Sequence, residues 1–306
     1  MFSKKIHTPT IEIKPRELKK HNIRLFIKRD DLTDPVISGN KYRKLKYNLI
    51  SAQKQGYKTL LTFGGAYSNH IHAAASAGSR FGFKTIGVIR GERPKKLNPT
   101  LVDAELFGME LHFVSRTAYR EKKDPGFIED LNKKYGDFFL VPEGGSNPLA
   151  VKGCIEIVDD FDDTYDYVTL ACGTGGTLAG IVAGLNGKSR VLGFPVLKGG
   201  SFLYDDISNL IRQFNGKEYD NWLLSTQYHF GGYAKYNWDL IKFINYIHIK
   251  HKLRLDPVYT GKMLFGVCDL VHHGYFPDNS KILAIHTGGL QGIRGFNQRF
   301  GSLIRV

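Results

Sequence analysis

Residues 167–185 read YVTLACGTGGTLAGIVAGL. The first six of them, Tyr167–Cys172, form a near-continuous apolar run, which is typical of a strand buried on both faces of a parallel sheet. Three glycines within Gly173–Gly176 then lead into Leu178–Leu185, where small and apolar residues favour a helix. A strand, a glycine-rich turn and a helix in this order form the unit from which parallel α/β proteins are built.

The same alternation runs outward from this stretch in both directions. Further strands are predicted at Lys58–Gly64, Lys84–Ile89, Glu110–Val114, Phe138–Val141, Arg190–Phe194 and Lys281–Ile285, and helices at Ala73–Ala77 and Thr100–Phe107. Short apolar strands that alternate with helices predict an α/β fold with parallel sheets and helices in the outer layers. A chain of 306 residues suits two domains of ordinary size.

The composition is that of a globular protein, with 42% hydrophobic and 24% charged residues. The net charge is +14, yet Lys and Arg are spread along the chain apart from short clusters such as Arg90–Lys96. Neither zinc-finger spacing nor RNP-type aromatic residues accompany them. A solvated basic surface is therefore expected, with no nucleic acid as partner. A basic phosphate- or nucleic-acid-binding protein without catalysis is the alternative from another functional class.

The cysteines and the chain start indicate a compartment. Cys154, Cys172 and Cys268 are far apart and odd in number, which predicts buried thiols in a reducing environment. The first residues lack the apolar stretch of a signal peptide, and no apolar run approaches the ~20 residues of a membrane span. The sequence therefore predicts a cytoplasmic protein that does not bind a membrane.

One lysine stands at a predicted helix start, in the segment Ser38–Leu45 (SGNKYRKL). Asn40 is expected to be the N-cap, and Leu45 and Leu49 follow Lys41 by four and eight residues. Lys41 should therefore lie on the apolar face, with Lys44 and Lys46 pointing elsewhere. Burial and the helix dipole both favour a neutral amine at Lys41, which Schiff-base chemistry requires. A lysine that extends from the first turn to solvent is the alternative.

Two glycine-bounded helix starts can bind anions. Phe63–His70 (FGGAYSNH) carries Ser68 and Asn69 as donors for a carboxylate, and Cys172–Gly180 carries Thr174 and Thr177 beside glycines that let backbone amides approach a phosphate. Ordinary capped turns are the alternative for both segments. No metal site is expected, because the spacing of His70 with His72, and of His272 with His273, does not place both rings on one helix face.

Together these segments resemble one family, the fold-type II pyridoxal phosphate (PLP) enzymes that include 1-aminocyclopropane-1-carboxylate (ACC) deaminase and D-cysteine desulfhydrase. The similar segments, in order, are Lys28–Leu32, Ser38–Leu45, Gly64–His70, Pro142–Ser146, Gly173–Gly180, Asp256–Lys262 and His286–Gly289. The resemblance implies a three-layer, two-domain fold similar to the tryptophan synthase β chain, with PLP between the domains. We expect residues 1–45 and 156–306 to form the large PLP-binding domain and residues 46–155 the small one.

The resemblance also implies a role for each site residue. Lys41 would hold PLP as a Schiff base, and Asn69 would bond the cofactor ring hydroxyl. Ser68, Asn69 and His70 would receive the substrate carboxylate. The loop of Gly173, Thr174, Gly175, Gly176 and Thr177 would clamp the phosphate. Tyr259 would be the active-site tyrosine, which meets the substrate, and Thr287 the uncharged partner of the pyridine nitrogen. A homodimer is expected as well.

The activity expected from this resemblance is the breakdown of a small amino acid. Lys41, once displaced by the substrate amine, would remove the α-proton, and a β-substituent would leave to give pyruvate and ammonia. ACC deaminases carry a tyrosine close to the last glycine pair, where this chain has Ile285 before His286–Gly289 (HTGG). We therefore expect α,β-elimination from D-cysteine or a similar β-substituted amino acid. ACC deamination to 2-oxobutyrate is the alternative.

Overall fold

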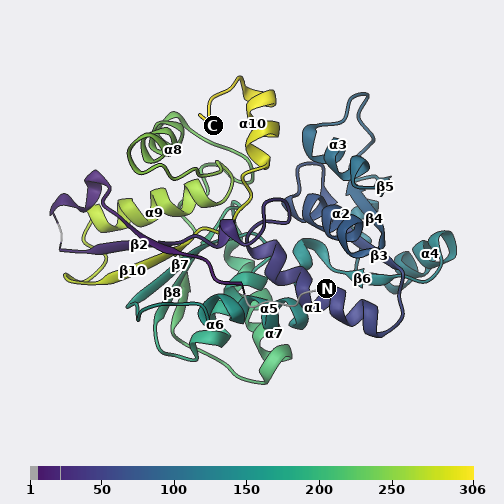
Figure 1. The fold of residues 1–306 in the computed structure, drawn as a ribbon, viewed down its shortest axis with the longest axis horizontal. Coiled ribbons are helices and arrows are strands. Elements are labelled where there is room, and N and C mark those ends of the chain that lie inside the picture. Colours follow the sequence, from purple (N-terminus) through teal and green to yellow (C-terminus); the bar gives the residue numbers. More distant parts are fainter. Residues whose placement is uncertain (1–5, 21) are drawn as a thin grey trace.

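The computed structural model of the protein describes residues 6–20 and 22–306, and two sheets lie at its centre with helices packed around them (Figure 1). The strands are β1 (Thr10–Ile13), β2 (Arg24–Lys28), β3 (Thr59–Gly65), β4 (Lys84–Arg90), β5 (Met109–Val114), β6 (Phe139–Val141), β7 (Tyr167–Cys172), β8 (Arg190–Pro195), β9 (Trp222–Leu224) and β10 (Lys281–Ile285). The α-helices are α1 (Asn40–Lys54), α2 (Asn69–Phe81), α3 (Pro99–Leu106), α4 (Pro125–Tyr135), α5 (Pro148–Val158), α6 (Gly176–Leu185), α7 (Leu203–Asn215), α8 (Trp238–His251), α9 (Thr260–His272) and α10 (Gly292–Phe300).

The smaller sheet has the order β5-β4-β3-β6, and all its strand pairs are parallel. Side chains of β3 alternate between two apolar clusters. Leu60 packs with residues of α1 and α2, and Leu61 and Phe63 pack with Tyr119 and Leu131 on the other face. Both faces of this sheet are therefore buried, which explains why its strands read as continuous apolar runs.

The larger sheet has the order β1-β2-β10-β7-β8-β9. Its pairs are parallel except for the edge pair of β1 with β2. Along β10, Ile282 and Ala284 face one apolar cluster, and Leu283 and Ile285 face the other. The predicted α/β fold with parallel sheets is confirmed, and the predicted strands are present within one or two residues.

Helices connect the two halves of the structure. Helix α1 packs against α5, and α5 packs against α6. The predicted domain boundaries, after residues 45 and 155, fall inside α1 and α5. The four strands of the smaller sheet lie between residues 59 and 141, and the strands of the larger sheet come from both sides of this segment. The division into residues 46–155 and the remainder stays a prediction.

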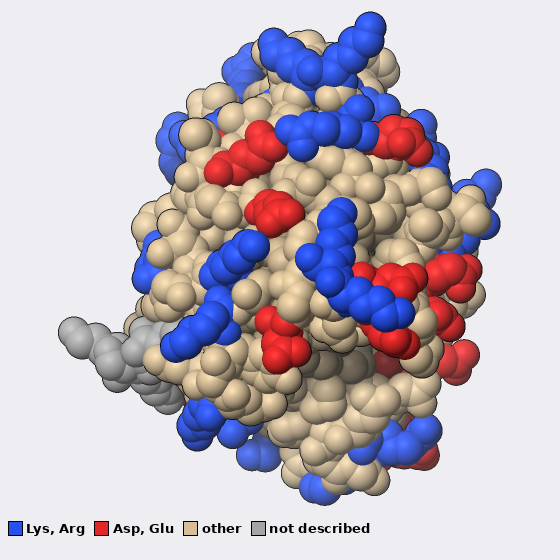
Figure 2. Space-filling view, turned by 90° about the vertical axis from the view of Figure 1, so that its right-hand side faces the viewer, with Lys and Arg blue, Asp and Glu red and all other residues tan. Residues whose placement is uncertain are grey.

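The surface and the thiols bear on two further expectations. Cys154, Cys172 and Cys268 are buried and free, as predicted. In Figure 2 the Lys and Arg side chains are spread over the visible face, with Asp and Glu side chains between them. Within residues 6–20 and 22–306, none of the helices combines the length and the apolar character of a membrane span.

Candidate active site

The predicted site segments follow the carboxyl ends of three strands, where open α/β sheets bind ligands. Gly173–Gly176 follows β7, Ser68–His70 follows β3, and Thr287 follows β10. Hydrogen bonds join these segments across long sequence separations. The side-chain nitrogen of Asn40 donates to Thr177 Oγ1 at 2.9 Å, and its backbone N–H donates to the carbonyl oxygen of Thr287 at 3.2 Å.

The start of α1 depends on a close backbone contact. Gly39 is the N-cap, with a φ of 65°, and a Cβ at this position would lie 2.0 Å from the carbonyl oxygen of Thr287. Only glycine fits here. The prediction that Asn40 is the N-cap is therefore wrong: Asn40 is the first helical residue, and its side chain reaches Thr177 instead.

Lys41 lies in the first turn of α1, and its Nζ donates to Asn40 Oδ1 at 3.2 Å. Leu45 and Leu49 are buried on this helix, as the spacing predicts. Burial lowers the pKa of Lys41 to about 8. The amine is therefore much closer to its neutral, nucleophilic form at physiological pH than an exposed lysine is.

Three lysines that are more deeply buried than Lys41 also have partners. Lys28 forms an ion pair with Asp160 at 2.8 Å. Lys262 Nζ donates to two backbone carbonyls at 2.8 and 2.9 Å, and Lys44 Nζ donates to Ser146 Oγ at 2.8 Å. Among the described residues, Lys41 Nζ bonds the neutral side-chain amide of Asn40, and Lys41 is the lysine to which the resemblance to PLP enzymes assigns the covalent bond.

Lys44 differs from its prediction. It does not point away from Lys41, because a residue three positions along a helix lies on the same side. Its side chain is 1% exposed. Burial is the main cause that lowers the pKa of Lys44 to about 7, and the charge of Lys41 adds to it. Lys46 does reach elsewhere and pairs with Glu156.

An anion cradle surrounds Lys44 Nζ. At the start of α6 no side chain caps the first turn, so its amides keep their donors for a ligand. Ser146 Oγ and Thr174 Oγ1 lie 2.6 Å apart beside it. A Cβ on Gly176 would lie 2.7 Å from Ser146 Oγ and 3.0 Å from Lys44 Nζ. Amides, two hydroxyls and one amine therefore converge where a glycine lets Ser146 and Lys44 come close to the backbone, and this arrangement suits a phosphate group.

The segment after β3 is tied to the opposite side of the site. Ser68 Oγ caps α2 by accepting from the backbone N–H groups of His70 and Ile71. Asn69 Oδ1 accepts from Gln291 Nε2 at 3.0 Å, and a Cβ on Gly289 would lie 2.6 Å from Asn69 Nδ2. Ser68 and Asn69 therefore stand where the chain after β3 meets the chain after β10.

His70 is less suited to the predicted carboxylate contact. Thr62 Oγ1 donates to the carbonyl of Val141 and so accepts from His70 Nε2 at 2.8 Å, which leaves Nδ1 as a buried acceptor without a partner among the described residues. Burial holds the pKa of His70 well below its usual value. A neutral ring with only an acceptor remaining cannot donate to a carboxylate. We therefore correct this role of His70.

Tyr259 lies over the glycine loop of the cradle. A Cβ on Gly173 would come within 3.2 Å of the Tyr259 ring, and Asp256 Oδ2 accepts the backbone N–H of Tyr259 at 2.8 Å. Tyr233 packs against Tyr259 edge to face, with ring centroids 6.1 Å apart. Burial raises the pKa of Tyr259 well above its usual value, so its phenol stays protonated.

Four residues of this arrangement were missed by sequence reasoning: Lys44, Ser146, Gln291 and Tyr233. The spacing of Lys44 from Lys41 was a usable signal. Ser146 lay inside a segment similar to the PLP enzymes, but that similarity gave it no role.

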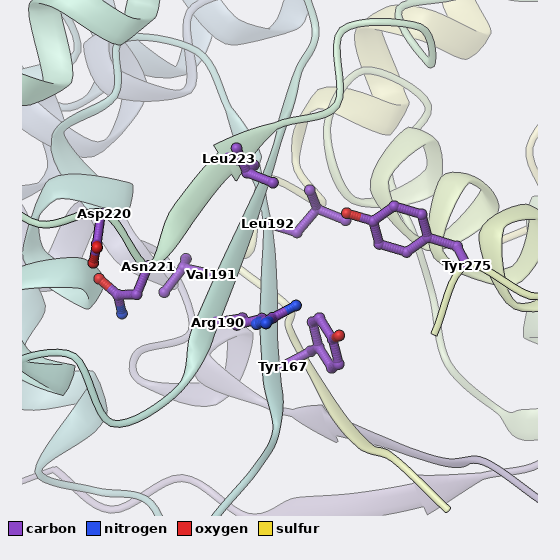
Figure 3. A pocket seen from close by; sticks show the side chains of 8 residues that line it. All are labelled: Tyr167, Arg190, Val191, Leu192, Asp220, Asn221, Leu223 and Tyr275. Carbon is purple, nitrogen blue, oxygen red and sulfur yellow. The ribbon is translucent and has the colours of Figure 1, made fainter. Parts of the chain in front are cut away.

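A separate pocket of about 200 Å³ lies at the amino-terminal ends of β7 and β8 in the larger sheet (Figure 3). Tyr167 and Arg190, which line it, are the first residues of β7 and β8, and Asn221 precedes β9. The glycine loop follows the other end of β7. This pocket is therefore distinct from the candidate active site.

The sequence matches the family described as "Pyridoxal-phosphate dependent enzyme" over residues 4–288. The chain belongs to this family. The cofactor is therefore PLP, and the chain is an enzyme. The fold and the resemblance predicted from the motifs are confirmed, and the alternative of a binding protein without catalysis is wrong.

Several relatives of this PLP enzyme cover nearly the whole chain. A Pyrococcus horikoshii protein provisionally named ACC deaminase is 32% identical and covers 92% of this chain and 89% of its own. The "Bifunctional D-cysteine desulfhydrase/1-aminocyclopropane-1-carboxylate deaminase, mitochondrial" of Arabidopsis thaliana is 31% identical and covers 92% of this chain and 76% of its own. A solved structure described as an ACC deaminase homologue has a TM-score of 0.84 at 31% identity and covers 97% of this chain and 94% of its own.

The cradle gives a first test of cofactor binding. Gly176→Ala should lower the affinity for PLP roughly tenfold, because the added methyl group displaces Lys44 and Ser146 from the phosphate. The backbone of Gly176 has no positive φ, so the change should leave the fold intact. Gly175 suits this test less, because its Cβ would meet Ile207 at 2.5 Å.

The measurement is a titration of cofactor-free protein with PLP, followed by absorbance. Gly184→Ala on the same helix is the matched control, since its Cβ would meet Val158 instead. Equal PLP affinity of Gly176→Ala and the control would contradict the phosphate cradle.

Proposed function

We propose that the enzyme eliminates a β-substituent from a small amino acid, with D-cysteine as the reference substrate, to give pyruvate and ammonia. The observation that carries this proposal is the uncharged Thr287, which is buried two residues after the end of β10 and joined to the start of α1 by its carbonyl oxygen. An uncharged partner leaves the pyridine nitrogen of PLP less than fully protonated, and the ring is then a weaker electron sink. A weak sink suits a good leaving group such as hydrosulfide.

Each residue of the site would have its own role in holding the cofactor or in moving a proton. Lys44, Ser146, Thr174 and the first amides of α6 hold the phosphate, and Lys41 binds the cofactor through its amine. When bound, PLP supplies the electron sink for negative charge at the α-carbon. Lys41, released by the substrate amine, takes up the α-proton as general base.

The substrate side would be built from the chain after β3 and from Tyr259. The hydroxyl proton of Ser68 and the side-chain amide of Asn69 are donors for the substrate carboxylate, while Asn69 is also the expected partner of the ring hydroxyl. Tyr259, protonated because burial raises the pKa of its phenol, can donate to the leaving group. This division supports an acid at the β-carbon and a base at the α-carbon.

The second candidate function is ACC deamination. The names of the relatives from Pyrococcus horikoshii and Arabidopsis thaliana favour it, since both include this activity. Opening a cyclopropane expels carbon, which needs a stronger electron sink than hydrosulfide does. Ile285 is fully buried in the core at the end of β10, so no phenol comes from this position.

A substrate comparison decides between the two candidates. At saturating concentration, D-cysteine and β-chloro-D-alanine should turn over at least about tenfold faster than ACC, because the barrier to carbon expulsion is higher at a weak sink. Pyruvate, 2-oxobutyrate and ammonia are measured in parallel, with the L-enantiomers as controls for configuration. Comparable or faster formation of 2-oxobutyrate from ACC would show that the Thr287 argument is wrong.

Two further expectations remain proposals. We infer a homodimer and a cytoplasmic location. The first is tested by the mass of the protein in solution and the second by fractionation of cells.

A further inference from the structure

The side chain of Gln291 joins the start of α10 to the start of α2. Gln291 Nε2 donates to Asn69 Oδ1 at 3.0 Å, although the two residues lie 222 positions apart in the sequence. In the described part of the chain, residues 6–20 and 22–306, no acceptor bonds Asn69 Nδ2. A carboxamide carries its acceptor and its two donors on opposite branches. With the oxygen held by Gln291, the nitrogen of Asn69 is therefore left for a ligand.

The backbone that carries Gln291 is fixed. It lies in a turn that is closed by the backbone N–H of Gly292, which donates to the carbonyl oxygen of Gly289 at 3.0 Å. Gln291 is also the residue that precedes the first turn of α10. Further along this helix, Arg294 pairs with Asp103 of α3. The Gln291 side chain therefore starts from a defined backbone position and not from a free loop.

The free nitrogen of Asn69 lies against the chain that follows β10. A Cβ on Gly289, whose φ is 88°, would lie 2.6 Å from Asn69 Nδ2. The same segment meets the start of α1, since the carbonyl oxygen of Thr287 accepts the backbone N–H of Asn40 at 3.2 Å. Asn40 precedes Lys41 in the chain. The free donor therefore stands where the segments that carry Thr287 and Lys41 meet, and both of these residues are expected contacts of the cofactor.

We propose that Gln291 is a positioning residue that holds the Asn69 amide with its nitrogen, and not its oxygen, toward the ring hydroxyl of PLP. The inference rests on the proposed function, in which Asn69 is the partner of that hydroxyl. A donor at this place stabilises the deprotonated ring oxygen, so the bound cofactor loses its proton at lower pH. The reversed amide would present an acceptor and would have the opposite effect.

The test is a pH titration of the PLP-loaded enzyme, followed by the visible absorbance of the bound cofactor. Gln291→Met removes the hydrogen bond at similar size and should raise the midpoint of the absorbance change by about 0.4–1 pH unit, the shift that corresponds to one net hydrogen bond. Gln291→Glu should raise the midpoint further. A carboxylate only accepts, so it takes the Asn69 nitrogen as its donor and turns the amide oxygen toward the cofactor.

Two further variants separate this role from others. In an Asn69→Ala background neither change at Gln291 should move the midpoint, because Gln291 acts through Asn69. This background also removes the direct effect of the new charge in Gln291→Glu from the comparison. It should fold, since Ser68 still caps α2. Arg294→Met is the matched control on α10, because it breaks the pair with Asp103 and leaves the Gln291 side chain in place. It should titrate as the wild type does.

Three results would overturn the inference: a wild-type midpoint in both Gln291 variants, a shift by Gln291→Glu that persists without Asn69, or an equal shift in Arg294→Met. Because the titration needs no substrate, its outcome is independent of the reaction that the enzyme catalyses. If the wild type fails to act on D-cysteine while the midpoints shift as expected, the proposed function fails and the role of Gln291 stands. Turnover of D-cysteine with unchanged midpoints would reject the role of Gln291 alone.

Discussion

Lys41→Ala is expected to abolish covalent PLP binding and to lower turnover by at least about 10³-fold. The change removes both the amine that holds the cofactor and the base that takes the α-proton. Lys44 bonds Ser146 in the phosphate cradle and Lys262 bonds two carbonyls, so we expect neither of them to take over the covalent bond. The PLP affinity itself should fall less than turnover, since the phosphate cradle remains intact.

The measurement is reduction of the loaded enzyme with borohydride, followed by peptide mapping of the labelled lysine. The wild type should carry the label on Lys41, and Lys41→Ala should carry none. Lys46→Ala, in the same helix, is the control and should be labelled as the wild type is. Label on any other lysine of the wild type would refute the role of Lys41.

The pH dependence of PLP binding tests the role of the Lys41 amine independently of the labelling experiment. Burial lowers the pKa of Lys41 to about 8, and only the neutral amine attacks an aldehyde. Below this pH the amine is mostly protonated, so the rate of capture by cofactor-free wild type should rise with pH and level off above about 8. A plateau that begins only near the usual pKa of a lysine would contradict burial of the amine.

The strands that the sequence predicted best are those buried on both faces. Tyr167–Cys172 has the predicted bounds because every residue of it is buried, so the apolar run ends where the strand ends. β1 (TIEI) and β9 (WLL) lie at sheet edges and are only four and three residues long. Short edge strands are partly exposed, and their apolar pattern is too weak to predict them.

The site was predictable where a local pattern carries the chemistry. A helix start that contains glycines indicates an anion site from sequence alone. The spacing from Lys41 to Leu45 and Leu49 predicted the apolar face of helix α1. Tyr233 could not be found in this way. Its place depends on the Lys262 contacts with a loop 30 residues away, and no local pattern encodes a contact at that separation.

For His70, a role was predicted from its position in the sequence, but the hydrogen bonds around the ring decide otherwise. Its position in a similar segment suggested a contact with the substrate, but its role depends on the hydrogen bonds of Thr62 in β3 and Val141 in β6, whereas His70 itself lies in α2. These bonds decide which nitrogen of the ring carries a proton, and this cannot be read from residue types.

Lys44→Met is the second change with a large expected effect, and it should separate phosphate binding from covalent chemistry. The methionine fills similar space but removes the amine that lies against Ser146 and Gly176 in the cradle. A hydrogen bond to a charged group contributes about 1.5–3 kcal/mol, so PLP affinity should fall roughly 10- to 100-fold. Borohydride should still label Lys41.

Pyridoxal, which lacks the phosphate, makes this prediction specific. Lys44→Met should bind pyridoxal as well as the wild type does, because the lost charge faces only the phosphate.

Proton uptake gives a further test of Lys44. Burial and the charge of Lys41 lower the pKa of Lys44 to about 7 in the cofactor-free protein. A phosphate dianion stabilises the protonated amine and so favours its uptake of a proton. Binding of PLP to the wild type should therefore take up protons above about pH 7, measurable by calorimetry in buffers of different ionisation enthalpy. Lys46→Met is the control, since Lys46 pairs with Glu156. Equal losses of PLP and pyridoxal affinity in Lys44→Met would place the role of Lys44 in the fold of α1 and not in the phosphate site.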